Sequence, residues 1–305
     1  MGDLDGKVAI VTGAARGLGR THALQLASQG ARIVVNDLGG NADGTGRDEE
    51  PARAVCEEIE QLGSEAVPHF GDVASWDDAK SMIQTALDSF GSLEILVNNA
   101  GFLRDGTLFS LTEDDFDSVI RVHLKGHFCP MRHAAQYWRE TSKAKGGPLY
   151  GRLISTASES YLFAPPGQPN YSAAKAGIVS LTMGAAQLLQ KYGVTANVFI
   201  PRARTRMTDV GPLAAMFAKP EEGFDAFAPE NTSPLIGYLA SPRAERVSGY
   251  VFIIWNQEVK IVSRPGIDAV FANEGQWTTD DLHAALSPYF EKREPVSDGY
   301  TVPPM

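Results

Sequence analysis

The sequence predicts an α/β protein with a single doubly wound parallel sheet, helices on both faces of that sheet, and a C-terminal extension. Three observations support this fold class. Short apolar runs alternate with longer amphipathic stretches along residues 1–200. The apolar runs are continuous in valine, isoleucine and leucine, which is typical of strands that are buried on both faces. A glycine-rich segment, TGAARGLG at 12–19, lies where the first strand meets the first helix.

The apolar runs and the amphipathic stretches give the expected elements in order. Strands are predicted at 7–13, 31–37, 65–73, 93–101, 151–158, 194–201 and 250–255, the last of them ending the sheet. Helices are predicted between them, at 18–30, 49–63, 75–91, 112–140 and 171–193. Gly30 and Gly63 are suited to end two of these helices, and Ser75 and Thr112 to begin two others. Strands that alternate with helices in this way indicate a parallel sheet with helical crossovers.

One Rossmann-type domain is expected over residues 1–256, and residues 257–305 form the C-terminal extension. The extension contains a short helix that is capped at Thr278 or Thr279. Residues 202–230 are irregular and rich in apolar side chains. These side chains are Met207, Leu213, Met216, Phe217, Phe224 and Phe227. Two interpretations are open for this region: a small apolar subdomain, or a lid over an apolar substrate.

The composition excludes several classes of function. The chain has 305 residues, a formal net charge of -10 and a pI of about 5.1. No cluster of lysine and arginine offsets this charge, so nucleic acid is not an expected partner. Cys56 and Cys129 lack CxxC spacing and the histidines lack metal-ligand spacing, so no metal is expected. Without a signal-peptide pattern or an apolar run of membrane-spanning length, a cytoplasmic protein with no membrane partner is expected.

The segment at 12–19 has the composition of a phosphate-binding turn. Gly13, Gly17 and Gly19, with Leu18 between the last two, allow a tight turn and a close approach of the backbone to a pyrophosphate. The helix that follows offers free N–H groups and the positive end of its dipole. The spacing is GxxxGxG rather than the GxGxxG of the common fingerprint. A flexible turn is the alternative, and the position at the first strand-to-helix junction favours phosphate binding.

Two charged residues bear on the choice between NAD and NADP. Asp37 ends the second predicted strand, where a carboxylate accepts hydrogen bonds from the adenosine ribose and repels a 2′-phosphate. Arg16 has the opposite effect, because a guanidinium in the glycine loop can hold a 2′-phosphate. We give Asp37 more weight because it lies where the ribose is expected. The sequence therefore predicts NAD as the cofactor, with NADP as the less favoured alternative.

Polar and small residues also follow the third and fourth predicted strands. Asp72 and Val73 come after the third strand, where the carboxylate can face an adenine amino group or simply cap a turn. The motif NNAG, with Asn99, Ala100 and Gly101, follows the fourth strand. A backbone that passes close to a ligand needs such small residues. An asparagine that ties neighbouring strands together is the alternative, and both interpretations can hold at once.

Taken in order, these motifs resemble those of the short-chain dehydrogenase/reductase family. The set comprises TGAARGLG, the DV pair at 72–73, NNAG, Ser158, YSAAK at 171–175 and IPRARTRMT at 200–208, and the resemblance covers residues 5–256. The segments VVNDLGG, RVHLKGHF, GQPNYSAAKAG and RTRMT carry a closer likeness. They resemble the (3R)-hydroxyacyl-CoA dehydrogenase unit of peroxisomal multifunctional enzyme type 2 and related bacterial hydroxysteroid and 3-hydroxyacyl-CoA dehydrogenases.

The resemblance implies that residues 1–256 form a domain for dinucleotide binding and catalysis, and it implies a catalytic set. Tyr171 is then the general acid/base, Lys175 is its partner and a ligand of the nicotinamide ribose, and Ser158 holds the substrate oxygen. Tyr171 and Lys175 lie four positions apart, so a helix places both on one face. Pro201 and Thr205, in the motif after the sixth predicted strand, are implied to contact the cofactor. The same resemblance implies a homodimer or a homotetramer.

Two positions depart from the wider family. His123, in RVHLKGHF, stands where the family has an asparagine that serves a proton relay. Two interpretations are open: His123 carries the relay through a ring nitrogen or a water, or it packs as a structural residue. The chain also reads WNQE at 255–258, where the family often has a glycine pair after the last strand. That change bears on subunit contacts or on the placement of the tail.

Oxidation of a secondary alcohol requires a base whose pKa lies near the working pH. A free tyrosine has a pKa of about 10, and lowering it by about 3 units needs roughly 4 kcal/mol of preference for the phenolate. An exposed ion pair supplies about 1 kcal/mol or less. We therefore expect Lys175 to tune Tyr171 only with help from partial burial and from the positive charge of bound NAD⁺. Ser158 donates a hydrogen bond to the substrate oxygen as its charge changes.

The expected substrate is an apolar secondary alcohol, and a (3R)-3-hydroxyacyl-CoA is the leading hypothesis. This hypothesis depends on the resemblance and on the apolar residues 202–230. Arg202, Arg204 and Arg206 are candidates to bind CoA phosphates, with solvated loop charges as the alternative. A hydroxysteroid dehydrogenase is the second enzymatic hypothesis. A non-catalytic NAD-binding regulator belongs to another class, and the presence of the whole catalytic set argues against it.

Overall fold

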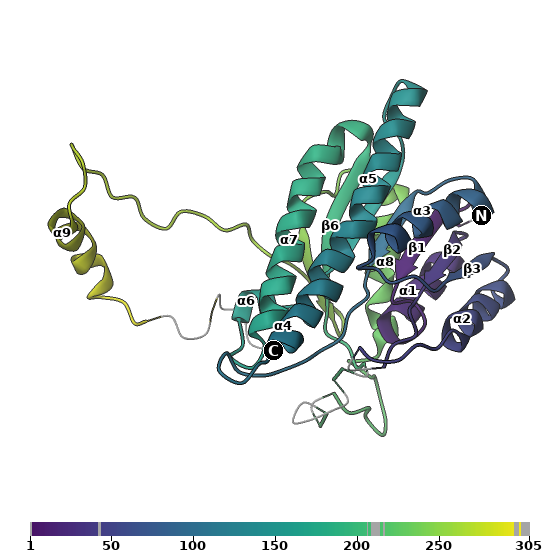
Figure 1. The fold of residues 1–305 in the computed structure, drawn as a ribbon, viewed down its shortest axis with the longest axis horizontal. Coiled ribbons are helices and arrows are strands. Elements are labelled where there is room, and N and C mark those ends of the chain that lie inside the picture. Colours follow the sequence, from purple (N-terminus) through teal and green to yellow (C-terminus); the bar gives the residue numbers. More distant parts are fainter. Residues whose placement is uncertain are drawn as a thin grey trace.

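Eight strands form one sheet through the described part of the molecule (Figure 1). The computed structural model describes residues 2–41, 44–205, 207–208, 214–215, 217–295 and 299. The strands are β1 Val8–Thr12, β2 Arg32–Asn36, β3 Ala66–His69, β4 Ile95–Asn98, β5 Gly151–Thr156, β6 Val194–Pro201, β7 Val251–Trp255 and β8 Glu258–Ile261. They run in the order β3-β2-β1-β4-β5-β6-β7-β8, parallel throughout except for β7 with β8. The predicted doubly wound α/β fold is therefore confirmed.

Helices cover both faces of this sheet (Figure 1). One face carries α1 Gly17–Ser28, α2 Glu50–Gln61 and α8 Ser233–Ala240. The other face carries α3 Trp76–Phe90, α5 Gly126–Lys145 and α7 Pro169–Leu189. Ser75 caps α3 as predicted, because its side chain accepts a hydrogen bond from the Asp78 N–H. The cores of the two faces are separate, and the sheet lies between them.

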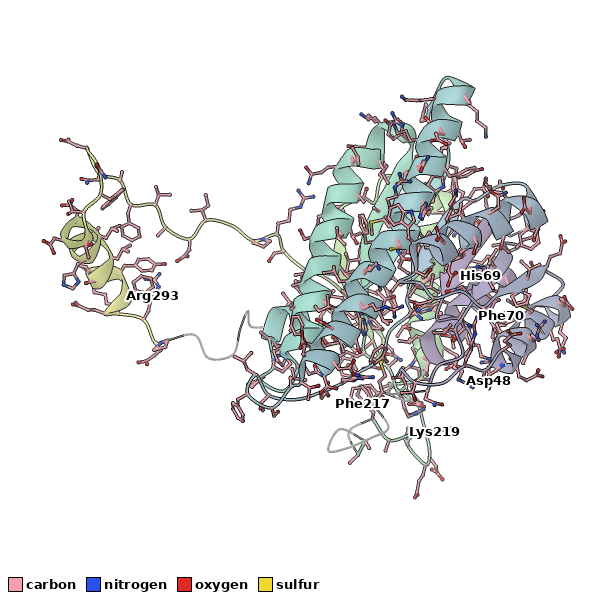
Figure 2. The ribbon with its side chains drawn as sticks, in the orientation of Figure 1. Asp48, His69, Phe70, Phe217, Lys219 and Arg293 are labelled. Carbon is pink, nitrogen blue, oxygen red and sulfur yellow. The ribbon has the colours of Figure 1, made fainter. Side chains whose placement is uncertain are left out.

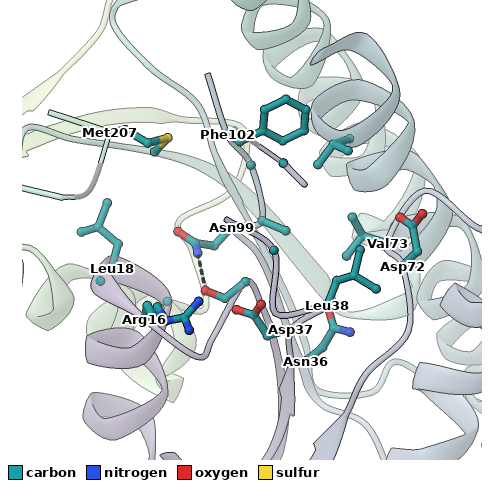
Figure 3. A pocket seen from close by; sticks show the side chains of 18 of the residues that line it. Arg16, Leu18, Asn36, Asp37, Leu38, Asp72, Val73, Asn99, Phe102 and Met207 are labelled. Atoms are coloured by element: carbon teal, nitrogen blue, oxygen red, sulfur yellow. Dashed lines mark hydrogen bonds between the residues drawn. The ribbon is translucent and has the colours of Figure 1, made fainter. Parts of the chain in front are cut away.

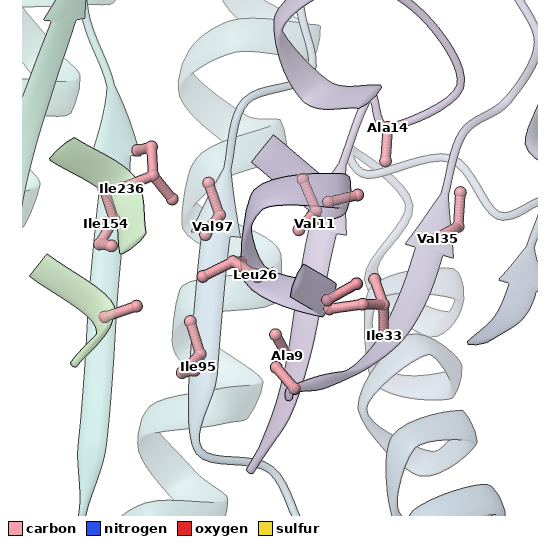
Figure 4. Close-up of a cluster of buried hydrophobic side chains, with 14 of the residues drawn as sticks. Ala9, Val11, Ala14, Leu26, Ile33, Val35, Ile95, Val97, Ile154 and Ile236 are labelled. Atoms are coloured by element: carbon pink, nitrogen blue, oxygen red, sulfur yellow. The ribbon is translucent and has the colours of Figure 1, made fainter. Parts of the chain in front are cut away.

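The strands are apolar at successive positions because each of them buries two faces. Val11 and Ile33 belong to the cluster under α1 and α8, where Leu26 and Ile236 meet them (Figure 4). Ile10 lies one position along β1 and packs in the opposite cluster, under α3, α5 and α7. Burial on both sides explains why these strands show no polar alternation in the sequence.

The long helix predicted over 112–140 is divided into three parts. α4 Glu113–Ile120 begins at a capping box on Thr112, a π-helical turn spans Arg121–Lys125, and α5 continues to Lys145. Pro130, inside α5, has no N–H for the carbonyl of Gly126 and crowds that carbonyl with its ring. A wider turn immediately before Gly126 is a physical response to that crowding. The π turn carries His123.

The sequence predicts that 250–255 is the last strand, and this is wrong. β8 follows it and pairs antiparallel with β7. The WNQE segment forms the tight turn of this hairpin, with Asn256 in the left-handed region at φ 54°. Two helices also escaped the prediction. α6 Ser160–Phe163 is a single turn, and α8 is buried on so many sides that its helical period is not visible.

The C-terminal arm, residues 262–295, extends away from the body (Figures 1 and 2). Its helix, α9 Thr279–Phe290, is capped by Thr278, which settles the choice between the two predicted caps. Farther on, Gly299 lies against the body, where a Cβ on it would be 2.5 Å from the Leu162 carbonyl oxygen of α6. No helix among the described residues has the length and apolar character needed to cross a membrane.

Apolar side chains of the arm are exposed. Ile267 is 84% exposed and Val270 is 81% exposed. The arm holds one small cluster of its own, in which Phe271 meets Tyr289 edge-on and Arg293 lies over the same ring. A cluster of this size buries little area, so most of the apolar surface of the described arm is open to solvent in the single chain.

Candidate active site

A pocket opens at the carboxyl edge of the sheet, where β1, β2 and β4 end (Figure 3). The strand order reverses between β1 and β4, and such switch points are where open α/β sheets bind ligands. Many residues predicted to contact the cofactor line this pocket: Gly13, Arg16, Gly17, Leu18, Gly19, Asp37, Asp72, Val73, Asn99, Ala100, Gly101 and Thr205. Pro201, Tyr171 and Lys175 are not among its described lining residues.

The glycine loop between β1 and α1 has no room for side chains at two positions. A Cβ on Gly19 would lie 1.9 Å from the Gly13 carbonyl oxygen, and a Cβ on Gly13 would lie 2.8 Å from the Ala100 Cα. Gly13 also has a φ of +64°, in the region that favours glycine. The loop therefore packs directly against the end of β4. This packing brings the backbone and the N-terminus of α1 to the pocket wall.

Asp37 joins the two loops that frame the pocket. Its carboxylate accepts hydrogen bonds from the Ala15 N–H at 2.9 Å and from the Gly39 N–H at 2.7 Å. Arg16 turns toward Asp48 instead, with its Nη2 3.3 Å from a carboxylate oxygen. A negative charge is thus fixed at the end of β2. The positive charge of Arg16 faces the Asp48 carboxylate of the neighbouring loop.

Asn99 ties β1 to β4, as one of its two interpretations predicts. Its Nδ2 donates to the Thr12 carbonyl at 3.1 Å and to the Gly13 carbonyl at 3.3 Å, and Figure 3 draws one of these bonds as a dashed line. Asp72 caps the turn after β3 by accepting the Ala74 N–H at 2.8 Å, and it pairs with Arg121. Both residues line the pocket and stabilise its walls at the same time.

Sequence reasoning missed several lining residues: Asn36, Leu38, Gly40, Asn41, Gly44, Gly71, Phe102, Arg121 and Val122. Asn36 gave the one signal that could have been used. It is a polar residue that follows three apolar ones, Ile33–Val35, and the structure buries it fully, which is costly unless its amide is bonded. Its Nδ2 donates to the Gly71 carbonyl at 2.9 Å and so fastens β2 to the end of β3.

α7 places Tyr171 and Lys175 side by side near its N-terminus. Lys175 is 2% exposed, and its Nζ donates to the Thr156 carbonyl at 2.8 Å. The same Nζ lies 5.4 Å from the centroid of the Tyr171 ring. The lysine is therefore anchored on the end of β5, beside the tyrosine.

Burial moves the pKa values of both residues away from what proton transfer needs. It raises the pKa of Tyr171 to about 12, although a hydrogen bond with Ser158 acts in the opposite direction. It lowers the pKa of Lys175 to about 7. The pair is buried, as expected, but desolvation penalises the phenolate and the ammonium alike, so burial by itself does not lower the pKa of Tyr171. The hydrogen bond with Ser158 favours the phenolate, and the positive charge of a bound cofactor would favour it further.

His123 packs between Tyr171 and the pocket. The two rings meet edge-on, with 5.1 Å between centroids and 90° between planes. The His123 Nε2 lies 2.7 Å from the Phe102 carbonyl oxygen, so the backbone holds the ring in place. Gly101 leaves the space for this ring, because a Cβ there would be 2.2 Å from its Cε1. Burial and the charge of Lys175 lower the pKa of His123 well below its usual range, so the ring is neutral at neutral pH.

Arg202 and Arg204 are both engaged in ion pairs. Arg202 pairs through two nitrogens with Glu159, and the side chains are 11% and 10% exposed. Arg204 pairs with Asp225. The interpretation as solvated loop charges is therefore wrong for both, and binding to CoA phosphates would compete with these carboxylates. Arg206 lies outside the described residues.

Aromatic side chains fasten the 202–230 region to the sheet. Phe217 contacts Phe227 with 4.6 Å between ring centroids, and Phe227 stacks on Trp255 of β7 at 5.6 Å. Met207 lines the pocket itself. Leu213 and Met216, also named in this region, lie outside the described residues. The region thus brings an apolar side chain to the pocket while its aromatic residues pack against the sheet.

These features fit a bound dinucleotide. The glycine cradle excludes side chains where a pyrophosphate must approach the backbone, and the Asp37 carboxylate stands at the end of β2. Next to that pocket lie a phenol, an ammonium and a serine hydroxyl, the groups needed to move a proton and hold an oxygen. Together they define a class of protein, the NAD(P)-dependent dehydrogenases.

Comparison with known families identifies the family. Residues 7–210 match the family described as short chain dehydrogenase. The chain belongs to this family, as its motifs predict. It is an oxidoreductase that acts on CH–OH groups with a nicotinamide nucleotide as cofactor.

Individual relatives agree with this assignment. Hydroxyacyl-CoA dehydrogenase ChsB1 of Mycobacterium tuberculosis is 45% identical over 296 residues, which cover 96% of this chain and 91% of that protein. Peroxisomal multifunctional enzyme type 2 of Drosophila melanogaster is 40% identical over 247 residues, which cover 81% of this chain but 38% of that longer protein. The crystal structure of a short chain dehydrogenase from Mycobacterium avium matches with a TM-score of 0.85 and 42% identity, covering 99% of this chain and 100% of that one.

Proposed function

We propose that this chain uses NAD to interconvert a (3R)-3-hydroxyacyl-CoA and the corresponding 3-oxoacyl-CoA. The observation that carries the proposal is the meeting of Tyr171, Lys175 and Ser158 beside the glycine-lined pocket. The similarity to a hydroxyacyl-CoA dehydrogenase over nearly the whole chain supports the substrate class. The apolar Met207 in the pocket wall suits an acyl chain.

The proposed roles follow from the chemistry of each group. In the oxidation, Tyr171 takes the proton of the substrate hydroxyl, and Ser158 holds the substrate oxygen. Lys175, anchored on the Thr156 carbonyl, stabilises the phenolate by its charge. The nicotinamide, when bound, takes or returns the hydride. Because burial raises the pKa of Tyr171 to about 12, the base form depends on positive charge brought close to the ring.

His123 is proposed as the residue that positions the Tyr171 ring. Its Nε2 is bonded to the Phe102 backbone, and its Nδ1 is buried without a partner among the described groups. A relay through Nδ1 therefore needs a water, which is the alternative role. The edge-on contact with Tyr171 supports the positioning role.

The preference for NAD over NADP rests on Asp37. Two backbone N–H groups hold its carboxylate at the end of β2, where a 2′-phosphate would meet its negative charge. Arg16, which could favour the phosphate, is paired with Asp48. Asp37→Ala should lower the ratio of the Kd for NADP to the Kd for NAD by about tenfold, which is about 1.4 kcal/mol. A Kd for NADP that is tighter than that for NAD in the unmodified enzyme would overturn the preference.

A panel of substrates tests the proposed function directly. The panel contains 3-hydroxyacyl-CoAs of several chain lengths in both configurations and steroid alcohols, each with NAD and with NADP. NADH absorbance reports turnover, and the proposal expects the (3R) acyl-CoAs with NAD to give the highest kcat/KM. No turnover with any acyl-CoA would sink the substrate assignment. Turnover of steroid alcohols alone would favour the hydroxysteroid dehydrogenase that we hold as second candidate, because an apolar pocket wall also suits a steroid.

Activity of any kind argues against a non-catalytic NAD-binding regulator. That third hypothesis predicts nucleotide binding without turnover of any alcohol in the panel. The presence of Tyr171, Lys175 and Ser158 in one cluster is what favours catalysis over this alternative.

A homodimer or homotetramer in the cytoplasm is proposed as the working form. The exposed apolar residues of the arm need a cover, and Leu108 and Phe109, 83% and 93% exposed, border an apolar groove on the body. Cys56 and Cys129 are both unpaired and buried, which suits a reducing compartment. Analytical ultracentrifugation of the full chain and of a chain ending at residue 261 tests the assembly. A truncated chain with the same number of subunits and the same kinetics as the full chain would refute a role for the arm.

A further inference from the structure

A buried ion pair lies directly beside Ser158. Glu159, the next residue along the chain, accepts hydrogen bonds from the Arg202 Nε and, at 2.7 Å, from the Arg202 Nη2. The two side chains are 10% and 11% exposed, so little water reaches the pair. Two parallel hydrogen bonds between a carboxylate and a guanidinium fix the orientation of both groups. None of the chemistry assigned above uses this pair.

The pair joins two segments that carry different parts of the site. Glu159 begins α6, and its carbonyl accepts the Leu162 N–H at 2.8 Å, so this turn holds the backbone that follows Ser158. Arg202 follows β6, and its N–H donates to the Ile254 carbonyl of β7 at 3.0 Å. The pair therefore fastens the single turn of α6 to the ends of β6 and β7.

An aromatic ring supports the Arg202 guanidinium from another side. Its Cζ lies 5.3 Å from the centroid of the Trp255 ring at the end of β7, and Trp255 stacks in turn on Phe227. The Arg202 Nη1 is buried and has no hydrogen-bond partner among the described groups. Glu159 therefore supplies the two side-chain hydrogen bonds that orient the guanidinium.

Stability alone does not explain a buried pair of this kind. The cost of taking a carboxylate and a guanidinium out of water offsets much of their attraction, and apolar residues of similar volume often stabilise a fold equally well. Two directed hydrogen bonds do supply something that apolar side chains lack, namely a fixed distance and angle between the two segments.

We propose that Glu159 and Arg202 are positioning residues that hold the Ser158 hydroxyl where it donates a hydrogen bond to Tyr171 and, once substrate is bound, to the substrate oxygen. This inference rests on the proposed function, in which Tyr171 moves the proton and Ser158 holds the substrate oxygen. Ser158 needs such support because it lies in the connection between β5 and α6 rather than inside either element.

The position of Ser158 has a measurable effect on Tyr171. Burial raises the pKa of Tyr171 to about 12, and the hydrogen bond with Ser158 acts in the opposite direction. If the pair no longer held α6, this bond would weaken and the pKa of Tyr171 should rise further. The other groups that act on Tyr171 are Lys175 on its own helix, the neutral His123 ring from the π turn and, from farther away, the Asp105 carboxylate.

Replacement of both partners by apolar residues tests the proposal. Glu159→Leu/Arg202→Met keeps the net charge of the site and leaves neither charge buried alone, so this double variant should fold. The phenolate absorbance of Tyr171 is titrated with NAD⁺ bound, and the same titration of Tyr171→Phe is subtracted to remove the other tyrosines. The pKa of Tyr171 should rise by about one pH unit in the double variant, as expected when one hydrogen bond to a charged form is lost.

Ser158→Ala shows whether the pair acts through the serine. If it does, the double variant should shift the pKa of Tyr171 only in a chain that keeps the Ser158 hydroxyl. Arg20→Met/Glu58→Leu is the matched control, because it replaces another ion pair made through two nitrogens, between α1 and α2, and should leave this pKa unchanged. An equal shift without the Ser158 hydroxyl, an equal shift in the control, or no shift in a double variant that circular dichroism shows to be folded would overturn the proposal.

Arg202→Lys is a second test that does not depend on the folding of the apolar pair. Lysine keeps the positive charge but cannot form two parallel hydrogen bonds with Glu159. The pKa of Tyr171 should therefore rise in this variant as well, by less than in the double variant. An unchanged pKa would show that the charge of Arg202, and not the orientation that it imposes, is what the site requires.

Kinetics distinguish the two proposals. The kcat for oxidation of the alcohol should fall about 10- to 100-fold in the double variant, as expected for a small displacement of a reacting group, and no further in a chain that already carries Ser158→Ala. If the unmodified enzyme turns over no 3-hydroxyacyl-CoA, the proposed substrate is wrong, and the titration, which needs only the nucleotide, still decides the role of the pair. If it turns over that substrate and neither kcat nor the pKa responds, Glu159 and Arg202 have no positioning role.

Discussion

The nucleotide pocket and the catalytic cluster are built by different means. In the pocket, the backbone forms the wall, and Gly13 and Gly19 are required because the chain passes too close for a side chain. In the cluster, buried side chains supply the reacting groups, and burial shifts their pKa values away from the ordinary ones. Lys175 and Tyr171 are the two clearest cases. The pocket is therefore sensitive to added volume, and the cluster is sensitive to the loss of single polar atoms.

Tyr171→Phe should have the largest effect, and it probes the cluster alone. The variant removes the one oxygen that carries the proton while the ring and its contact with His123 stay in place. The expected loss in kcat is about 100- to 10,000-fold. The Kd for the nucleotide, measured by calorimetry, should change little because the pocket is not lined by this side chain. Retained activity would show that another group moves the proton.

Gly19→Ala should break the pocket and leave the cluster intact. A methyl group at this position would lie 1.9 Å from the Gly13 carbonyl oxygen, so the loop must shift. We expect the nucleotide Kd to rise about 10- to 100-fold and the free energy of unfolding to fall by about 1–3 kcal/mol. Denaturation in urea and fluorescence titration measure the two effects.

Gly184→Ala is the matched control for that experiment. Gly184 lies inside α7, and a Cβ there would meet no heavy atom within 4 Å. Alanine should therefore raise the free energy of unfolding by about 0.5–1 kcal/mol and leave the nucleotide Kd unchanged. Equal behaviour of the two variants would mean that crowding at Gly19 is not what shapes the pocket.

The charge of Lys175 should make stability depend on pH. Its pKa is about 7 in the folded chain and near the ordinary 10.5 when unfolded, so between these values the unfolded chain binds the extra proton. The free energy of unfolding should rise from pH 7 to 10, by up to about 1.4 kcal/mol per pH unit. Above pH 10 Tyr171 opposes the trend, because its pKa is raised to about 12 in the folded chain.

Lys175→Met isolates this contribution. The other titrating groups are common to both proteins, so the difference in urea stability between them, measured at steps from pH 7 to 10, reports Lys175. The difference should grow with pH in favour of the lysine protein. If the difference in the free energy of unfolding did not change with pH, the lysine would keep its proton in the folded chain.

His123→Asn should have the smallest effect of the series. The ring is neutral, and the backbone of Phe102 holds it, so its removal loosens the packing of Tyr171 without taking away a charge. We expect kcat to fall by less than about tenfold, with no new pKa in the pH profile of kcat/KM. A loss of a hundredfold or more with an altered profile would favour the proton relay instead.

Most of the fold could be predicted because its signals are local. Continuous apolar runs gave the parallel strands, and Ser75 and Thr112 gave the starts of helices. The π turn escaped because nothing in the hydrophobic period of 112–140 marks it, and only Pro130 hinted at a disturbance. β8 escaped because a strand of four residues after a tight turn has no period long enough to detect.

The site divides in the same way. The glycine loop, Asp37 and NNAG lie next to strand ends, so their positions in the pocket followed from the sequence. The hydrogen bond between Gln168 and Asp105 did not, because these two residues come from segments that only the folded chain brings together. The pairing of Arg202 with Glu159 is of the same kind. The displaced pKa values could not be predicted either, since they depend on how completely each group is buried.

The C-terminal arm leaves the body at β8 and meets it again at Gly299, so the chain between is a closed loop rather than a loose end. The entropy of closing such a loop grows slowly with its length, at about 0.6 kcal/mol for each doubling. A reporter domain inserted in its exposed turn, near Gly275, would therefore cost the body little stability. In a protein engineer's terms, the arm is a tolerant insertion point on this enzyme.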